Sequence, residues 1–223
     1  CVSCGMCLVN CPFGAIADKS QIFQVIMAIN AGDEVIAEVA PAFVGQFGGK
    51  GNVDKLREAF KQLGFSGMEE VALGADLCTI QESEDFLEEV PEKIPFMGTS
   101  CCPAWSVMAK KEFPKNADCI SMALTPMTLT ARLIRKQHPN AKIVFVGPCS
   151  AKKLEAMRES VRSEVDFVLT FEEMAGIFEA RHIDVNTLKE DPHGVNDASA
   201  DGRNFAVSGG VAQAVVNVIK EKY

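Results

Sequence analysis

Residues 142–156 read KIVFVGPCSAKKLEA, and residues 94–105 read IPFMGTSCCPAW. Each stretch opens with a short apolar run, at 142–146 and at 94–97, which is typical of a buried strand. Each run meets a turn that contains glycine and cysteine, and a helix is predicted just after the cysteines. In open α/β sheets, ligands bind where strands end and helices begin. Cysteines at that edge indicate a soft metal centre better than they indicate packing alone.

Strands alternate with helices along the chain, which predicts an α/β fold with parallel sheets flanked by helices. The predicted strands cover residues 34–39, 94–97, 142–146 and 165–170. The predicted helices cover residues 18–33, 53–63, 75–90, 104–112, 127–138, 171–180 and 211–220, and another begins near residue 151. A glycine-rich break is expected at 45–51 and a polar loop at 188–204.

Four cysteines at the start of the chain have the spacing Cys1-x-x-Cys4-x-x-Cys7-x-x-x-Cys11-Pro. In bacterial ferredoxins the first three cysteines of such a run bind one [4Fe–4S] cluster, and the fourth binds another. We therefore expect Cys1, Cys4 and Cys7 to hold one cluster, and Cys11 to belong to a second cluster with ligands upstream of residue 1. The chain is thus expected to be a piece of a longer protein. We divide it into a partial ferredoxin-like segment, residues 1–17, and a large domain, residues 18–223.

The nine cysteines admit two other interpretations, and both fit less well. A disulfide framework is disfavoured because the count is odd and the chain is long enough to bury an ample core. Zinc would prefer two separated Cys-x-x-Cys pairs to a run of four. Iron–sulfur chemistry in a reducing compartment is the best interpretation of the sequence.

Composition and charge exclude several classes of function. The chain has 223 residues, 48% of them hydrophobic, and a formal net charge of −8. An acidic protein is a poor partner for nucleic acid, whose phosphates attract basic surfaces. No apolar run approaches the roughly 18 residues that span a bilayer, and no signal peptide is visible. We therefore expect a cytoplasmic protein that binds neither nucleic acid nor a membrane.

The cysteine motifs together resemble the [FeFe]-hydrogenases, through Cys-Cys-Pro at 101–103, Gly-Pro-Cys-x-x-Lys at 147–152 and the ferredoxin run. The resemblance implies the iron-hydrogenase active-site domain for residues 18–223. In that family the metal site is the H-cluster, a [4Fe–4S] cluster bridged through a cysteine to a diiron unit with carbonyl and cyanide ligands. Of its four cysteine ligands, the resemblance assigns two to Cys102 and Cys149.

The other two ligands belong to a motif that begins beyond residue 223. We therefore expect the domain to be incomplete at its C-terminal end and this chain not to hold the complete H-cluster by itself. A C-terminal continuation or a second subunit would have to complete the site.

The resemblance also implies roles around the diiron unit. Cys101 falls on the proton-transfer thiol. A thiol suits this task because its unperturbed pKa of about 8.5 can be tuned towards neutrality, so that it can give and take protons. Lys152 falls on the lysine that donates hydrogen bonds to a cyanide ligand, and Glu155, one turn later, is placed to pair with it. The plainer alternatives are a buried structural cysteine and a solvated lysine, and a solvated lysine is what we expect of Lys153.

Proton relay and pocket residues are also implied by the resemblance. Ser121 follows Cys101 by twenty residues, as the family's relay serine does, and Glu82 and Asp85 are the candidate relay carboxylates. The alternative for the two acids is an exposed acidic helix face. The diiron pocket would be touched by three further residues, Ala40, Pro41 and Pro126.

Three pocket positions depart from the family's prototype, which has methionine at Gly147, glutamine at Met127 and serine at Ala42. These differences place the chain in a divergent branch, some members of which sense hydrogen. Two cysteines, Cys78 and Cys119, match no motif and are expected to be small buried hydrophobic residues.

The sequence leaves four functions to weigh. The first is reversible reduction of protons to H2, with ferredoxin or another small carrier supplying electrons. The second is a hydrogen sensor with the same cluster. The third is an iron–sulfur assembly relative with cubanes only; such relatives lack the proton-transfer thiol, so Cys101 argues against it. The fourth, a plain electron carrier, leaves Cys101, Cys102 and Cys149 unexplained. The catalytic hypothesis is preferred.

Overall fold

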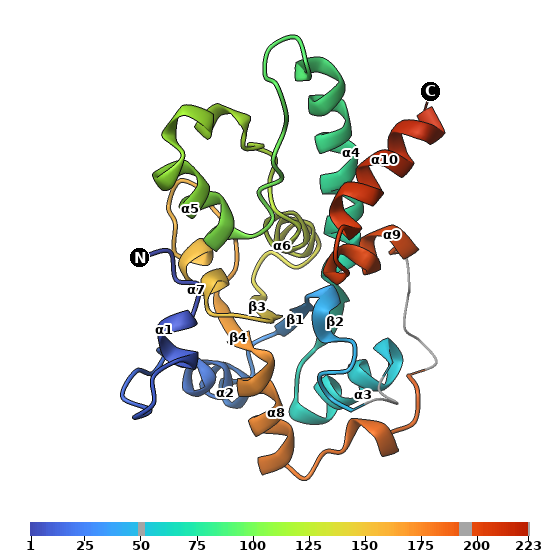
Figure 1. Ribbon diagram of the computed structural model, residues 1–223. Helices are drawn as coiled ribbons and strands as arrows, with labels where there is room; N and C mark the ends of the chain where they lie inside the picture. Colours follow the sequence, from blue (N-terminus) through green and yellow to red (C-terminus); the bar gives the residue numbers. More distant parts are fainter. Residues whose placement is uncertain (49–51, 192–197, 223) are drawn as a thin grey trace.

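The computed structural model describes residues 1–48, 52–191 and 198–222. Its centre is a sheet of four parallel strands in the order β2-β1-β3-β4 (Figure 1). The strands are β1 (Val35–Val39), β2 (Gly67–Glu70), β3 (Lys142–Gly147) and β4 (Phe167–Thr170). The parallel α/β architecture predicted from the sequence is confirmed. Because every strand runs the same way, the segments that follow the strands meet at one edge of the sheet.

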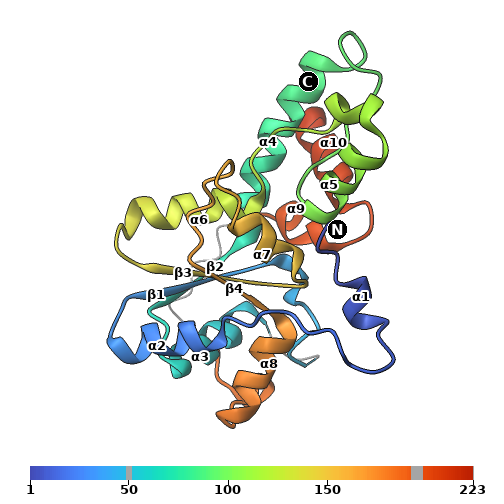
Figure 2. The same cartoon turned by 90° about the vertical axis from the view of Figure 1, so that its left-hand side faces the viewer.

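Helices cover both faces of this sheet (Figure 2). One face carries α2 (Ile22–Ala31), α3 (Val53–Leu63) and α8 (Phe171–Ala180). The other face carries α6 (Pro126–Gln137). With helices on both sides, all five residues of β1 are buried. Burial on both faces also explains the unbroken apolar run Ile143–Val146 in β3.

Successive residues of β1 serve the two faces in turn. Ala37 and Val39 belong to the larger core cluster, which includes Phe60 of α3. Ile36 belongs to a smaller cluster with Ala131 of α6. This alternation is the period of two that a strand imposes on its side chains.

A further group of helices extends from one end of β2. It comprises α4 (Val71–Glu89), α9 (Ala200–Arg203) and α10 (Gly210–Lys222), and α10 runs beside α4 in both views (Figures 1 and 2). Arg203 donates two hydrogen bonds of 2.9 Å to the buried carboxylate of Glu70. A bidentate, charge-assisted pair of this kind is strong, so it fastens the C-terminal helices to the point where β2 passes into α4.

The cysteine segments lead into short helices. These are α1 (Met6–Val9), α5 (Pro103–Glu112) and α7 (Ala151–Ala156). Short 3-10 segments lie at Pro41–Phe43, Pro114–Cys119, Val185–Thr187 and Asn204–Ala206. Within the described residues, no helix has the length and apolar character that crossing a membrane requires.

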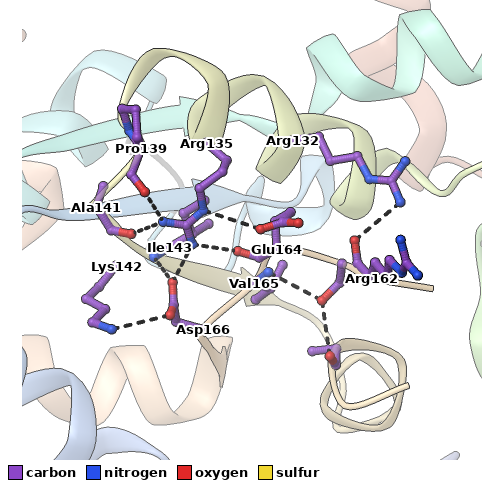
Figure 3. A network of polar contacts seen from close by, with 12 residues as sticks. Arg132, Arg135, Pro139, Ala141, Lys142, Ile143, Arg162, Glu164, Val165 and Asp166 are labelled. Carbon is purple, nitrogen blue, oxygen red and sulfur yellow. Dashed lines mark hydrogen bonds and ion pairs between the residues drawn. The ribbon is translucent and has the colours of Figure 1, made fainter. Parts of the chain in front are cut away.

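Arg135 fastens α6 to the sheet (Figure 3). Its guanidinium donates to the carboxylate of Asp166 at 2.9 Å and to the carbonyl of Glu164 at 3.1 Å. Asp166 also accepts a 2.9 Å hydrogen bond from the backbone N–H of Ile143, in β3. One carboxylate therefore joins the helix to both the third strand and the approach to the fourth.

One predicted strand is wrong. Residues 94–97 form no strand, because Pro95 has no N–H to donate to a ladder. Instead Gly98 makes an isolated parallel bridge with Ile120. The Gly98 N–H donates to the Cys119 carbonyl, and the Ser121 N–H donates to the Gly98 carbonyl, at 2.8 Å each. The double-cysteine loop is therefore held beside Ser121, not at the end of a sheet strand.

Other differences concern the extent of elements. No strand was predicted at β2, whose sequence Gly-Met-Glu-Glu lacks the β-branched and aromatic residues that strands favour; backbone pairing with β1 creates it. Helix α4 begins at Val71, directly after that strand and four residues earlier than predicted. Helix α9 falls within the predicted polar loop. Residues 49–51 of the predicted break and 192–197 of the predicted loop lie outside the described residues.

Gly74 permits the close approach of α4 to α6, and we expect its replacement to destabilise the fold. A Cβ there would lie 2.3 Å from Thr130 Oγ1 and 2.4 Å from the Pro126 carbonyl oxygen. Because a backbone carbonyl cannot move aside alone, Gly74→Ala should cost about 1–3 kcal/mol in the free energy of unfolding. The measurement is urea denaturation.

Gly176 of α8 provides the matched control, because a Cβ there meets nothing within 4 Å. Gly176→Ala should stabilise the helix by about 0.5–1 kcal/mol. Similar changes in both variants would contradict close packing of α4 on α6.

Candidate active site

The two cysteine segments meet at neighbouring helix starts. Cys102 is the N-cap of α5, and Cys149 lies in the turn between β3 and α7, as predicted. The Lys152 ammonium reaches from α7 to donate a 2.9 Å hydrogen bond to the carbonyl of Cys101. That bond brings the double-cysteine loop next to the helix that follows Cys149.

Lys152 belongs to a buried chain of polar groups. Its ammonium lies 2.7 Å from the carboxylate of Glu155, so the pairing expected from their spacing is present. The other carboxylate oxygen of Glu155 accepts a hydrogen bond from the Thr125 hydroxyl. The side chain of Glu155 is only 3% exposed. Thr125 is the N-cap of α6, so the chain links α6, α7 and the Cys101 loop.

Thr125 is a site residue that the sequence analysis missed. The available signal was its place before Pro126, since a threonine N-cap followed by proline commonly starts a helix. That signal identifies a cap, but it says nothing of the carboxylate that the threonine also contacts.

The buried part of α4 faces the other side of Cys101. Glu82 is fully buried, and among the described residues neither of its carboxylate oxygens has a hydrogen bond of regular geometry. Burial raises the pKa of Glu82, and the Ser121 hydroxyl and the Ser100 backbone lie close enough to offset part of that rise. The charge of Glu82 in turn acts on the pKa of the Cys101 thiol. The structure thus brings Cys101, Glu82 and Ser121 together.

Burial also governs the thiol itself. It raises the pKa of Cys101, while the nearby Lys152 ammonium acts in the opposite direction and Glu82 adds to the rise. In the chain alone the thiol is therefore held in its protonated form at neutral pH. The pKa of the thiol rises because removing a thiolate from water outweighs the effect of one nearby cation.

Asp85 lies one turn beyond Glu82, at the outer part of this face. It is half-buried and accepts a 2.8 Å hydrogen bond from Gln81, and its charge contributes to the raised pKa of Glu82. The alternative of an exposed acidic face holds for the neighbouring Glu84 but not for Glu82, which has no exposed surface. Cys78, one turn earlier, is buried as expected.

The three predicted pocket residues lie at element ends. Ala40 directly follows β1 and donates its N–H to the carbonyl of Val146 at 2.9 Å. Pro41 begins a 3-10 turn, and Pro126 is buried in the first turn of α6. The Ala40 contact lies at the end of β3, the strand that leads to Cys149.

Phe145 accounts for the glycine at 147. A Cβ on Gly147 would lie 2.2 Å from the Phe145 ring, so the ring already fills the space that a larger residue would need. The same ring lies 5.9 Å from the Lys152 ammonium, within the range of a cation–π contact. Phe145 therefore occupies the space that the methionine of the family's prototype would need at position 147.

The N-terminal cysteines lie at the surface. Cys1, Cys4 and Cys7 are exposed and Cys11 is partly exposed. The sulfur of Cys11 accepts a 3.4 Å hydrogen bond from the Ala15 N–H, and such backbone contacts lower the pKa of its thiol. A lowered pKa favours the thiolate that binds metal.

The N-terminal segment also touches both cysteine-bearing helices. The Ser150 hydroxyl, at the start of α7, donates to the carbonyl of Ser3 at 3.4 Å. The Lys111 ammonium, at the end of α5, donates to the carbonyl of Cys1 at 3.3 Å. The ferredoxin-like cysteines are therefore placed beside the segments that carry Cys102 and Cys149.

The donor chemistry fits iron–sulfur ligation in part. Thiolates suit iron–sulfur clusters, and a cubane takes four of them. Within the described ranges, no group of three His, Cys, Asp or Glu side chains converges on one point. Cys102 and Cys149 fit the two-ligand share assigned by the resemblance. Lys152 fits an anionic ligand, because an ammonium has three donors and the described residues engage two.

Comparison with known proteins identifies the family. The family described as "Iron only hydrogenase large subunit, C-terminal domain" matches residues 33–223. The chain belongs to this family.

Relatives and solved structures agree with that assignment. Iron hydrogenase 1 of Clostridium pasteurianum is 30% identical over 94% of this chain and 41% of its own length. The NADP-reducing hydrogenase subunit HndD of Solidesulfovibrio fructosivorans is 29% identical over 99% of this chain and 43% of its own. A variant of the [FeFe]-hydrogenase HydA1 from Chlamydomonas reinhardtii matches with a TM-score of 0.71 at 25% identity, covering 88% of this chain and 57% of that one.

The chain spans about two-fifths of the length of the two hydrogenases it matches. A second kind of relative is the cytosolic Fe-S cluster assembly factor NAR1 of Debaryomyces hansenii, 31% identical over 62% of this chain and 28% of its own length. The hydrogenase-family domain therefore has relatives named as enzymes and relatives named as assembly factors.

Two charged residues of this iron-hydrogenase domain are buried although the sequence analysis did not predict it. Glu38, in the middle of β1, is fully buried, and its carboxylate has no hydrogen-bond partner among the described residues. It was missed because the strand was judged by its apolar neighbours. Lys153, expected to be solvated, is instead buried beside the carboxylates of Asp18 and Glu173; a solvated lysine would extend away from α7, whereas this one lies against the loop before α2.

Glu38 should make stability depend on pH. Burial raises its pKa well above the usual 4.5, with Lys152 opposing and Glu155 adding to the shift. Above pH 4.5 the unfolded chain releases this proton while the folded chain retains it, so rising pH favours unfolding until the folded-state pKa is passed. Glu38→Gln should therefore stabilise the protein by an amount that grows from pH 5 to pH 8, measured by urea unfolding. A difference that stays flat or shrinks with pH would contradict a neutral Glu38.

Proposed function

We propose that this chain is part of an iron-only hydrogenase that reversibly reduces protons to H2, and that it supplies the proton-transfer side of the active site. The observation that carries the proposal is the meeting of Cys101, Glu82 and Ser121 beside the Lys152 ammonium. A thiol, a buried acid and a hydroxyl within reach of one another can pass a proton between them.

The roles of the residues follow from their positions. When bound, the H-cluster would supply the electrons and the metal centre at which H2 forms. Cys102 and Cys149 would serve as two of its ligands, and Lys152 would donate a hydrogen bond to one of its anionic ligands. Ala40, Pro41 and Pro126 would line the diiron pocket.

The proton route begins at the Cys101 sulfur. Because the thiol is protonated at neutral pH, it can donate its proton and take another from Glu82. Burial raises the pKa of Glu82, and a carboxyl group exchanges protons more readily as its pKa approaches the pH at which the protein works. The Ser121 hydroxyl lies near Glu82, and Asp85, which is half-buried, would connect the route to solvent.

The electron route would use the N-terminal segment. The ferredoxin spacing of Cys1, Cys4, Cys7 and Cys11 supports [4Fe–4S] clusters there, and residues 1–17 would form the ferredoxin-like unit. Its outward-facing position suits a small electron carrier such as ferredoxin.

A cubane-only iron–sulfur assembly factor is the second candidate. The similarity to NAR1 supports it. Cys101 favours the hydrogenase, because a proton-transfer thiol beside a buried acid has no use in a protein that only carries cubanes.

An infrared spectrum of the whole protein, matured anaerobically, separates the two. Metal carbonyl and cyanide bands that shift under H2 are the expected result for a diiron site. A protein that contains cubane iron and sulfide but gives no such bands would overturn the hydrogenase proposal and favour the assembly factor.

Glu82 should be needed for turnover but not for assembly of the site. In the matured protein, Glu82→Gln removes the exchangeable carboxyl proton and should slow H2 production and H2/D2O exchange by roughly 10²–10⁴-fold, with the infrared bands retained. Glu88→Gln is the control, because Glu88 is an exposed residue of the same helix and pairs with the exposed Lys93. Full activity of Glu82→Gln would exclude Glu82 from the relay.

A further inference from the structure

Lys153 carries a buried ammonium that the proposed function does not use. It lies 2.6 Å from the carboxylate of Asp18 and 3.0 Å from that of Glu173, and it donates to the carbonyl of Lys19 at 3.1 Å. The Lys153 side chain is only 9% exposed. Its three donors therefore all have acceptors. We name Lys153, Asp18 and Glu173 the Lys153 cluster.

The partners of Lys153 differ in how firmly they are held. Glu173 is fixed from within α8, because it forms a capping box with Thr170 whose backbone N–H donates to it at 2.7 Å. Asp18 and Lys19 lie in the stretch between α1 and α2, which has no helix or strand of its own. For that stretch, contacts with the rest of the chain are what determine its place.

The cost of burying a cation makes the contact specific. A buried ammonium without a partner is expensive, and removing one partner from a buried pair is strongly destabilising. Lys153 therefore favours the arrangement in which Asp18 lies against α7. Exposed pairs such as Lys222–Glu84 lack this penalty and contribute little.

The Lys153 cluster connects the two cysteine regions of the fold. Lys153 is four residues after Cys149, in the short helix α7 that follows it. Asp18 is seven residues after Cys11. Ser150, in the turn next to Cys149, also contacts the carbonyl of Ser3, so the N-terminal segment meets the Cys149 region near both of its ends.

We propose that Lys153 is a positioning residue that holds the N-terminal cysteine segment against the helix following Cys149. It thereby fixes the distance between the iron–sulfur clusters bound at the two cysteine regions. This rests on the proposed function, in which electrons pass between those clusters. Electron transfer falls steeply with distance, so a segment that swings away would lose the connection even with every ligand intact.

Trypsin cleavage after Lys19 tests the placement without any cluster. The carbonyl of the bond to be cut is the one that Lys153 holds. In the full chain, Lys153→Met should raise the cleavage rate at that bond at least 10-fold. Asp18→Asn should raise it as much, once the rate is divided by the cleavage rate of a synthetic peptide of residues 12–26 that carries the same substitution. This division removes the effect of the substitution on trypsin itself. Glu84→Ala, which breaks only an exposed pair, should leave the rate unchanged.

Asp18→Asn guards against misfolding, because Asp18 lies outside the core and its loss leaves Lys153 paired with Glu173. A cleavage rate unchanged in Asp18→Asn would overturn the proposal. So would a rate that rises only together with cleavage throughout the domain, since that would be general unfolding.

Electron paramagnetic resonance of the whole, cluster-loaded protein tests the consequence. The magnetic interaction between the reduced N-terminal cluster and the cluster bound by Cys102 and Cys149 should be lost or weakened in Asp18→Asn and unchanged in Glu84→Ala. An unaltered interaction, with faster cleavage, would reduce Lys153 to a structural role. Absence of carbonyl and cyanide bands would instead refute the hydrogenase proposal, while the cleavage result would still show whether the segment is held.

Discussion

The Lys152 ammonium makes the contacts on which the candidate active-site region depends. It joins the carbonyl of Cys101 to the carboxylate of Glu155, and Glu155 in turn accepts from Thr125 at the start of α6. Three elements that are distant in the sequence therefore share one buried charge. Moving one of these elements away would leave a buried charge without a partner, which costs free energy. The loop before Cys102 therefore stays close to the turn that holds Cys149.

Charge balance around this ammonium explains the protonation of its neighbours. Glu155 already pairs with Lys152, so no second cation among the described residues compensates Glu38 or Glu82. Both therefore have a raised pKa, chiefly through burial, and the Cys101 thiol behaves in the same way. In this region the pKa values of two carboxyl groups and one thiol are therefore shifted in the direction that favours their protonated forms.

The two lysines of the Ala-Lys-Lys stretch divide the work of positioning. Lys152 contacts the Cys101 loop, and Lys153 contacts the N-terminal segment through Asp18. Adjacent residues on a helix point about 100° apart, so one short helix can direct two ammonium groups at different parts of the chain. Gly74 in turn allows α4, the helix that carries Glu82, to pack closely on α6.

The sequence by itself determined the parallel α/β class, most helices, and the cysteines that lead into α5 and α7, because these depend on local periodicity and on motifs of fixed spacing. Only the tertiary structure decided that residues 94–97 are not a strand, that Gly67–Glu70 is one, and that Glu82 is buried next to Ser121. Pairing, burial and the choice of ion partner depend on what lies across from a residue in space. The motif alone gave Lys152 and Lys153 different roles, although they are neighbours of the same type in the sequence. It could not predict which groups each lysine contacts.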